Sequence, residues 1–242
     1  MEKRTWFIYP ADVFKPFDCF MSWELVTIVA ESNSWKTTFA MDIISKNAER
    51  GIKWFYINLE FPIRTMWESR WLWMNWKTKR NLTDLEPLTE QEQLKLDAYV
   101  ERQLNKFDYF NNPEWIDLKD LIELISEKAM EWYQLFVVDT FSRIHWNLDS
   151  QVAHTSQNKC MEQLQELAQR LWVAIVMLHH TNKQWTFEWS QKIKDLSNVF
   201  IIMSRWENGD WESYTEFELT KDKFITKTTV TAWYRNWEYF SC

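Results

Sequence analysis

The sequence predicts an α/β protein with a mainly parallel sheet flanked by helices and with antiparallel strands at its C-terminal edge. Two observations support this class. Apolar strand-like runs alternate with amphipathic helix-like runs, an order typical of parallel strands joined by crossover helices. Near the C-terminus, segments with period-two alternation are joined by turn residues, as in antiparallel strands. The chain of 242 residues is long enough for one such domain with a large core.

Each predicted strand is a short apolar or alternating run, and each predicted helix has apolar residues spaced by three and four. The predicted strands are residues 25–30, 54–59, 135–139, 173–179, 199–204, 214–220, 227–233 and 238–240. The predicted helices are residues 36–50, 90–106, 118–131 and 152–171. Residues 1–24 form an N-terminal lead-in, and residues 25–242 form a single domain with a helical insertion at about 61–117. This charged, aromatic-rich insertion is a lid, a subunit contact or a long surface excursion.

The composition is unusual, because the chain has 18 Trp and only 2 Gly. Ordinary proteins carry about 7% Gly, and the two residue types together restore that share. Trp23 precedes a predicted strand, and Trp172 follows a predicted helix where a terminating glycine belongs. Polar turn segments hold Trp206, Trp211 and Trp237. We infer that most tryptophans stand where the native protein has glycine, as results when a UGA codon is read as Trp in one genetic code and as Gly in another.

A genuinely Trp-rich protein would leave this placement at turns and helix ends unexplained. Some tryptophans nevertheless suit their surroundings. A dense aromatic stretch holds Trp67, Trp71 and Trp73, and we expect these three to be true tryptophans.

The most informative segment lies between the first predicted strand and the first predicted helix. It reads Ala30, Glu31, Ser32, Asn33, Ser34, Trp35, Lys36, Thr37, Thr38. With glycine at position 35 it has the form A-x-x-x-x-G-K-T, a phosphate-binding loop whose backbone N–H groups and helix N-terminus cradle phosphate. Lys36 would neutralise the β- and γ-phosphates of ATP, and Thr37 would ligate Mg²⁺ through its hydroxyl. An indole at position 35 would block the close approach of ligand to backbone.

Further polar residues follow predicted strands at the ends where α/β sheets place their ligands. Asp139 ends an apolar strand in the Walker B pattern, in which the carboxylate holds the Mg²⁺ shell. Glu60 follows a strand that we expect beside the loop strand. It either orients or deprotonates the attacking water, or is a solvated surface residue. His179 and His180 end the strand at 173–179 and are candidates to sense the γ-phosphate.

Five motifs occur in a characteristic order. They are Trp23-Glu24-Leu25, Ser34-Trp35-Lys36-Thr37-Thr38-Phe39-Ala40, Ile57-Asn58-Leu59-Glu60-Phe61-Pro62, Val137-Val138-Asp139-Thr140 and Leu178-His179-His180-Thr181-Asn182-Lys183. Together they resemble the RecA-like P-loop ATPase core, closest to the C-terminal motor domain of DnaB-type replicative helicases, over about residues 20–240. The resemblance implies that Glu60 is the catalytic carboxylate and that Ala30 is the common first residue of the loop.

The resemblance also implies partners. It places single-stranded DNA binding in the loop at residues 182–195, although lysines in a loop are otherwise solvated charges. The implied phosphate contacts are Lys183, Lys192 and Lys194. Lys221 and Lys223 resemble a late basic pair that reaches a neighbouring subunit's nucleotide, with Lys where the usual arginine finger stands. A homo-oligomeric ring or filament that uses ATP and Mg²⁺ is therefore implied.

The bulk properties restrict the function. The net charge of −7 argues against a broad nucleic-acid-coating surface but is compatible with a narrow basic channel. Three scattered cysteines suit a reducing, cytoplasmic setting, and the short apolar runs indicate no membrane partner. Three functions stay open: an ATP-hydrolysing motor on single-stranded DNA (helicase or recombination-type), a regulatory ATPase acting on a protein partner without DNA translocation, and a P-loop scaffold disabled by Trp35.

Overall fold

The computed structural model describes residues 5–31, 35–83, 85–145, 153–181, 187–207, 213–222, 227–235 and 238–241. Its strands are β1 (Trp6–Ile8), β2 (Cys19–Met21), β3 (Leu25–Ala30), β4 (Trp54–Asn58), β5 (Tyr109–Asn111), β6 (Ile116–Asp117), β7 (Leu135–Asp139), β8 (Ile144–His145), β9 (Ala174–His180), β10 (Val199–Glu207), β11 (Ser213–Lys221), β12 (Thr228–Arg235) and β13 (Glu238–Ser241). Its helices are η1 (Asp12–Phe17), α1 (Lys36–Ala48), α2 (Ile63–Met74), η2 (Lys79–Leu82), α3 (Glu90–Leu104), α4 (Leu118–Met130), η3 (Phe141–Arg143), α5 (Ala153–Leu171) and α6 (Phe187–Leu196).

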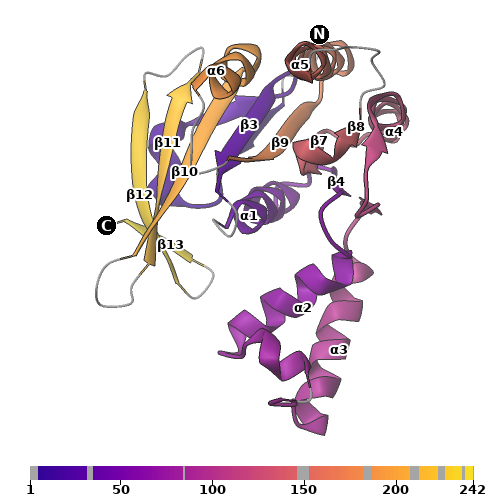
Figure 1. Cartoon of the computed structure of the whole chain (residues 1–242), viewed down its shortest axis with the longest axis vertical. Helices are drawn as coiled ribbons and strands as arrows, with labels where there is room; N and C mark the ends of the chain where they lie inside the picture. The colour runs from indigo at the N-terminus through magenta and orange to yellow at the C-terminus, as the bar shows by residue number, and fades with distance from the viewer. Residues whose placement is uncertain are drawn as a thin grey trace.

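A nine-stranded sheet organises the molecule, in the order β13-β12-β11-β10-β3-β9-β7-β4-β5. The strands from β10 to β5 pair in parallel, whereas β11, β12 and β13 extend the edge as antiparallel strands. The predicted fold class is therefore confirmed, including its antiparallel edge (Figure 1). Sequence patterns located every strand from β10 to β4 but missed the three-residue strand β5.

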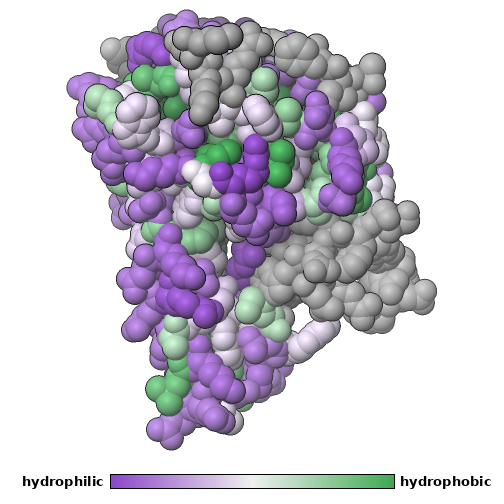
Figure 2. All heavy atoms as spheres, turned by 180° about the vertical axis from the view of Figure 1, so that it is seen from behind, coloured by the Kyte–Doolittle hydropathy of each residue, from purple (hydrophilic) through white to green (hydrophobic). Residues whose placement is uncertain are grey.

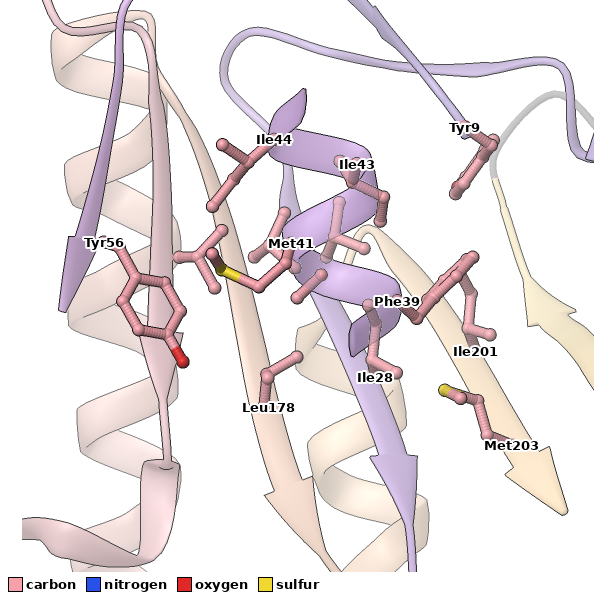
Figure 3. Packing of buried hydrophobic residues seen from close by; sticks show 14 of the residues in the cluster. Tyr9, Ile28, Phe39, Met41, Ile43, Ile44, Tyr56, Leu178, Ile201 and Met203 are labelled. Carbon is pink, nitrogen blue, oxygen red and sulfur yellow. The ribbon is translucent and has the colours of Figure 1, made fainter. Parts of the chain in front are cut away.

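Side chains from successive residues of the parallel strands enter two separate cores, because neighbouring residues of a strand point to opposite faces. Helix α1 covers one face, where Phe39, Met41 and Ile44 pack with Ile28 and Leu178 (Figure 3). Helices α4 and α5 contribute to the core on the other face. The continuous burial of β3, β7 and most of β9 follows from this two-sided cover. None of the helices in the described ranges combines the length and apolar character needed to cross a membrane.

The N-terminal segment belongs to the core on the α1 face. Strands β1 and β2 form an antiparallel pair around η1. Phe7, Phe14 and Phe20 are buried in this segment, and the Phe14 ring packs against Phe39 and Phe217 at centroid distances of 5.1 and 4.8 Å. The residues predicted as a lead-in, from position 5 onward, therefore connect α1 with the antiparallel edge of the sheet.

Between β4 and β5, the chain leaves the sheet as an arm made of α2, η2 and α3, which projects from the body in Figure 1. Capping boxes at Thr78 and Thr89 begin η2 and α3. The arm is the helical part of the predicted insertion, whereas β5, inside the same range, joins the main sheet. On the face seen in Figure 2, the arm is mostly hydrophilic with separate hydrophobic spots.

Backbone geometry supports glycine at the suspect tryptophans. Apart from Asp18, every non-glycine residue with positive φ in the described ranges is a tryptophan. The five are Trp23 (82°), Trp35 (63°), Trp76 (55°), Trp132 (71°) and Trp172 (56°). A side chain in this left-handed region costs about 1–2 kcal/mol per residue, and glycine avoids that cost. Exposed fractions of 84% for Trp76 and 82% for Trp132 leave little packing to offset the strain.

Other tryptophans behave as the real residue. Trp67 and Trp71 are 2% and 5% exposed and pack into the core from α2, as expected. Trp206 lies in strand β10 opposite Tyr214, so the expectation of a turn there is wrong. Trp211 and Trp237 lie outside the described residues, as does the side chain of Trp73.

Mass spectrometry of the protein from its native source is expected to find glycine at the positive-φ positions. The informative tryptic peptides are residues 129–143 and 171–183, each of which contains one suspect tryptophan, Trp132 or Trp172. Residues 65–70 provide the control, because the only tryptophan there is the buried Trp67. Intact tryptophan in all three peptides would contradict the hypothesis that these tryptophans are recoded glycines. We call the variant with glycine at the five positive-φ tryptophans the glycine-restored chain.

Candidate nucleotide site

The parallel register brings the predicted site residues to one edge of the sheet. Ala30 at the end of β3 is level with His180 on β9, and Asp139 at the end of β7 is level with Asn58 on β4. We expected β4, the strand before Glu60, to lie beside β3. This expectation is wrong, because β9 and β7 separate the two strands. Glu60 therefore approaches the loop across two intervening strands.

Lys36 lies in the first turn of α1 and is nearly buried. Its ammonium donates to the carbonyl oxygens of Ala30 at 3.1 Å and Glu31 at 2.9 Å, and to His180 Nδ1 at 3.2 Å. Burial lowers the pKa of Lys36, and the nearby Asp139 and Glu60 act in the opposite direction. The ammonium is thus held where the loop begins.

The rest of the loop is described only in part. Ser32, Asn33 and Ser34 lie outside the described residues, and Thr38 follows Lys36 in the first turn of α1. Trp35 occupies the N-cap of α1 with φ 63° and ψ 15°, and the Arg205 guanidinium carbon lies 5.8 Å from the centroid of its ring. The left-handed N-cap fits a loop that requires glycine at this point.

Asp139 is fully buried and accepts two hydrogen bonds on one oxygen. Thr37 Oγ1 and Tyr56 Oη both donate to its Oδ2 atom at 2.7 Å. Its Oδ1 atom is buried and accepts no hydrogen bond in the described part of the structure, and the nearby Glu60 carboxylate interacts with Asp139 electrostatically. Burial raises the pKa of Asp139, whereas the bonds from Thr37 and Tyr56 lower it.

Thr37 and Asp139 have oxygen atoms that fit the coordination of the Mg²⁺ ion that accompanies a bound nucleoside triphosphate. Mg²⁺ prefers oxygen ligands and binds through few protein groups, retaining water and phosphate oxygens. Such oxygen ligands are the Thr37 hydroxyl and the Oδ1 atom of Asp139, whose other oxygen accepts from Thr37. No larger cluster of His, Cys, Asp and Glu that could hold a metal occurs among the residues that the structure describes.

His180 joins Lys36 to Glu60. Its Nε2 atom lies 3.2 Å from Glu60 Oε2, and its Nδ1 atom lies 3.2 Å from Lys36 Nζ. An ammonium only donates, so Nδ1 accepts and the Nε2 hydrogen is donated to Glu60. This bond from His180 is the largest cause of a lowered Glu60 pKa, with burial acting against it. Glu60 is therefore an ionised, partly exposed carboxylate at the site.

The two histidines point to opposite faces, as neighbours on a strand must. His179 packs edge-on against Phe141 with ring centroids 5.3 Å apart, and burial lowers its pKa to about 4. Of the two predicted sensors, only His180 contacts the other site residues. This geometry favours His180 over His179 as the γ-phosphate sensor, and the assignment of either residue stays a prediction.

Three polar residues near the site received no role from the sequence: Asn58, which lies inside a quoted motif, and Tyr56 and Asn111, which lie outside the motifs. Asn58 Nδ2 donates to Asn111 Oδ1 at 2.6 Å and to the carbonyl of Phe61, and its Oδ1 atom accepts from the Glu60 backbone at 3.4 Å. These bonds connect β4, β5 and the turn that carries Glu60. The available signal was the polar type of Tyr56 and Asn58 within a strand that is otherwise apolar.

The predicted DNA-contacting lysines fall largely on a helix. Residues 187–195, which were expected in a loop, belong to helix α6, and Lys183 lies outside the described residues. Lys192 is exposed and Lys194 is half-buried. Lys221 donates to the carbonyls of Lys194 at 2.9 Å and Asp195 at 2.5 Å, which caps the C-terminal end of α6. Lys223 lies outside the described residues.

Comparisons with known proteins agree with this fold. Residues 18–185 match the AAA domain family. One solved structure, described as an ATPase domain, superposes with a TM-score of 0.75 and 11% identity, over 92% of this chain and 86% of that one. A DnaB-like replicative helicase, solved to show its interactions with primase, superposes with a TM-score of 0.72 and 11% identity, over 91% of this chain and 58% of that one. A comparison with curated proteins gives no match. The chain belongs to the AAA domain family, and its fold is that of the RecA-like P-loop ATPases, close to DnaB-type motor domains.

Proposed function

We propose that the protein hydrolyses ATP in the presence of Mg²⁺ and acts as a motor on single-stranded DNA, as a helicase or a recombination-type ATPase. The observation that carries ATP hydrolysis is the convergence of Lys36, Thr37, Asp139 and Glu60 at one sheet edge, connected through His180. These residues match three needs of phosphoryl transfer: Lys36 neutralises charge, Thr37 and Asp139 coordinate the metal, and Glu60 activates water.

Lys36 is the group that would meet the β- and γ-phosphates. Its present partners include two neutral carbonyls, which a polyphosphate of high negative charge outcompetes. Mg²⁺, when bound, neutralises charge that develops on the phosphate oxygens, and Thr37 and Asp139 would hold it. The loop residues from Ala30 to Thr38 would surround the phosphates through their backbone N–H groups.

Glu60 is the proposed base. A general base must be ionised and within hydrogen-bond reach of the water that it orients. The bond from His180 lowers its pKa, and its partial exposure leaves room for water. His180 lies between Lys36 and Glu60, which suits the proposed sensor of the γ-phosphate. When Lys36 turns to phosphate, His180 loses its hydrogen bond from the Lys36 ammonium.

DNA is the proposed partner on the strength of the fold and the lysines of α6. Lys183, Lys192 and Lys194 are the proposed contacts to backbone phosphates, and Lys221 and Lys223 are the proposed contacts to a neighbouring subunit's nucleotide in a ring or filament. The net charge of −7 favours the second candidate, a regulatory ATPase that acts on a protein partner. Lys221 also has a structural role in this chain, because it caps α6.

Single-stranded DNA is expected to raise the steady-state ATPase rate of the glycine-restored chain severalfold. Replacing both Lys192 and Lys194 by Ala should reduce the ratio of the DNA-stimulated rate to the DNA-free rate and weaken its dependence on salt, because two phosphate contacts are lost. Lys119→Ala is the matched control, since this exposed lysine lies on α4. An ATPase rate that is the same with and without DNA would favour the regulatory ATPase instead.

A further inference from the structure

Tyr56 carries a buried hydroxyl group that has no part in the proposed reaction as described so far. It lies in the middle of β4, is fully buried, and donates to Asp139 Oδ2 at 2.7 Å. Figure 3 shows its ring beside the α1 core with the hydroxyl directed toward the carboxyl ends of the strands. The phenol therefore reaches from the core to the proposed metal site.

The hydroxyl is not needed for packing. Phenylalanine differs from tyrosine only by the hydroxyl group, so a phenyl ring would fill nearly the same volume in the buried core around Tyr56. A buried hydroxyl without a partner costs free energy, and its bond to a carboxylate offsets that cost. The bond to Asp139 therefore explains why a tyrosine is tolerated at this position of the strand.

The two oxygens of Asp139 have different surroundings. Oδ2 accepts from both Tyr56 and Thr37, whereas Oδ1 is buried and accepts no hydrogen bond in the described part of the structure. Thr37 comes from α1 and Tyr56 from β4, so the carboxylate is fixed from two separate elements. Without the phenol, the carboxylate could rotate, and the Thr37 hydroxyl could bond to either oxygen.

We propose that Tyr56 is a positioning residue of the metal site: by occupying Oδ2 it holds the Asp139 carboxylate in the orientation that leaves Oδ1 for the Mg²⁺ shell. This inference rests on the proposed function. The Tyr56 ring is held by the surrounding core, so its hydroxyl is a rigid anchor that costs little side-chain entropy. Tyr56 does not need to touch nucleotide, and it acts only through Asp139.

The test is Tyr56→Phe in the glycine-restored chain, with binding of a fluorescent ADP analogue measured against Mg²⁺ concentration. We expect the Mg²⁺ concentration that gives half of the metal-dependent gain in affinity to rise roughly three- to tenfold, which is the order of one ordinary hydrogen bond. Binding in EDTA should stay at the parental level, because the phenol acts on the metal shell alone. Mn²⁺, followed by electron paramagnetic resonance, gives a second readout without turnover.

Tyr9→Phe is the matched control. Tyr9 belongs to the same core, but its buried hydroxyl has no partner in the described structure, so its loss should leave the Mg²⁺ dependence unchanged. Melting temperatures of both variants show whether the core is retained. A Tyr56→Phe curve that superposes on the parental curve would overturn the inference, as would an equal loss of binding with and without metal. A parent that binds no nucleotide would overturn the proposed function and the inference with it.

Discussion

Glu60→Gln in the glycine-restored chain is expected to lower ATP turnover by at least roughly a hundredfold, the lower range for loss of a general base. Binding of a non-hydrolysable ATP analogue should remain near the parental level. Glutamine has the same shape and its carbonyl oxygen can still accept the bond from His180, but it cannot take a proton from water. Steady-state hydrolysis and equilibrium binding, measured on the same preparation, separate the two effects.

The control for this substitution is Glu49→Gln, because Glu49 is an exposed carboxylate beyond the end of α1. It should leave both turnover and binding unchanged. Normal hydrolysis by Glu60→Gln would show that another group activates the water. Loss of binding together with turnover would instead assign Glu60 to holding the site, through His180 and Lys36.

Trp35 is expected to decide whether the protein binds nucleotide at all. The chain with tryptophan should show no measurable binding of ATP. The change Trp35→Gly should give a dissociation constant for ATP of about 1 μM to 1 mM, the ordinary range of enzyme KM values. The residue has a left-handed backbone at the N-cap of α1, in the loop where phosphate is expected to approach the backbone closely. Isothermal titration of both chains with Mg²⁺ and an ATP analogue measures the difference.

Two variants make this result interpretable. Trp35→Ala removes the indole but keeps a Cβ atom at positive φ, so it should recover less binding than glycine does. Lys36→Ala in the glycine-containing chain supplies the non-binding reference, since it removes the ammonium that meets phosphate. Equal binding by the tryptophan and glycine chains would show that the loop accommodates an indole. It would also exclude the disabled scaffold as a function.

The sequence predicted which residues follow strands, because apolar runs and loop motifs are local patterns. It could not order the strands in space, so Glu60 was placed beside the loop strand although β9 and β7 intervene. Glu60 is linked to Lys36 through the His180 side chain, which bonds to both. The spacing of residues along the chain does not reveal such a link. Element order is therefore predictable here, whereas contacts across several strands are not.

Sequence periodicity fixes the end of a strand and its pairing with the next strand only to within one residue. It therefore could not show which of His179 and His180 faces the loop. A shift of one residue exchanges the two faces of a strand. The N-terminal pair β1 and β2 was missed because three-residue strands carry too little pattern. Tyr56 was passed over because an aromatic residue in a buried strand is an ordinary core residue until its hydroxyl is seen beside Asp139.

Under the recoding hypothesis, five left-handed backbone positions also make the function of this gene depend on the genetic code of its host. In a cell that reads the codon as glycine, the product has an open phosphate loop and relaxed turns. In a cell that reads it as tryptophan, the same DNA yields a chain strained at five places, one of them inside the nucleotide site. Such a codon would limit gene transfer between organisms with different genetic codes. The gene could be transferred, but its product would be inactive in the new cell.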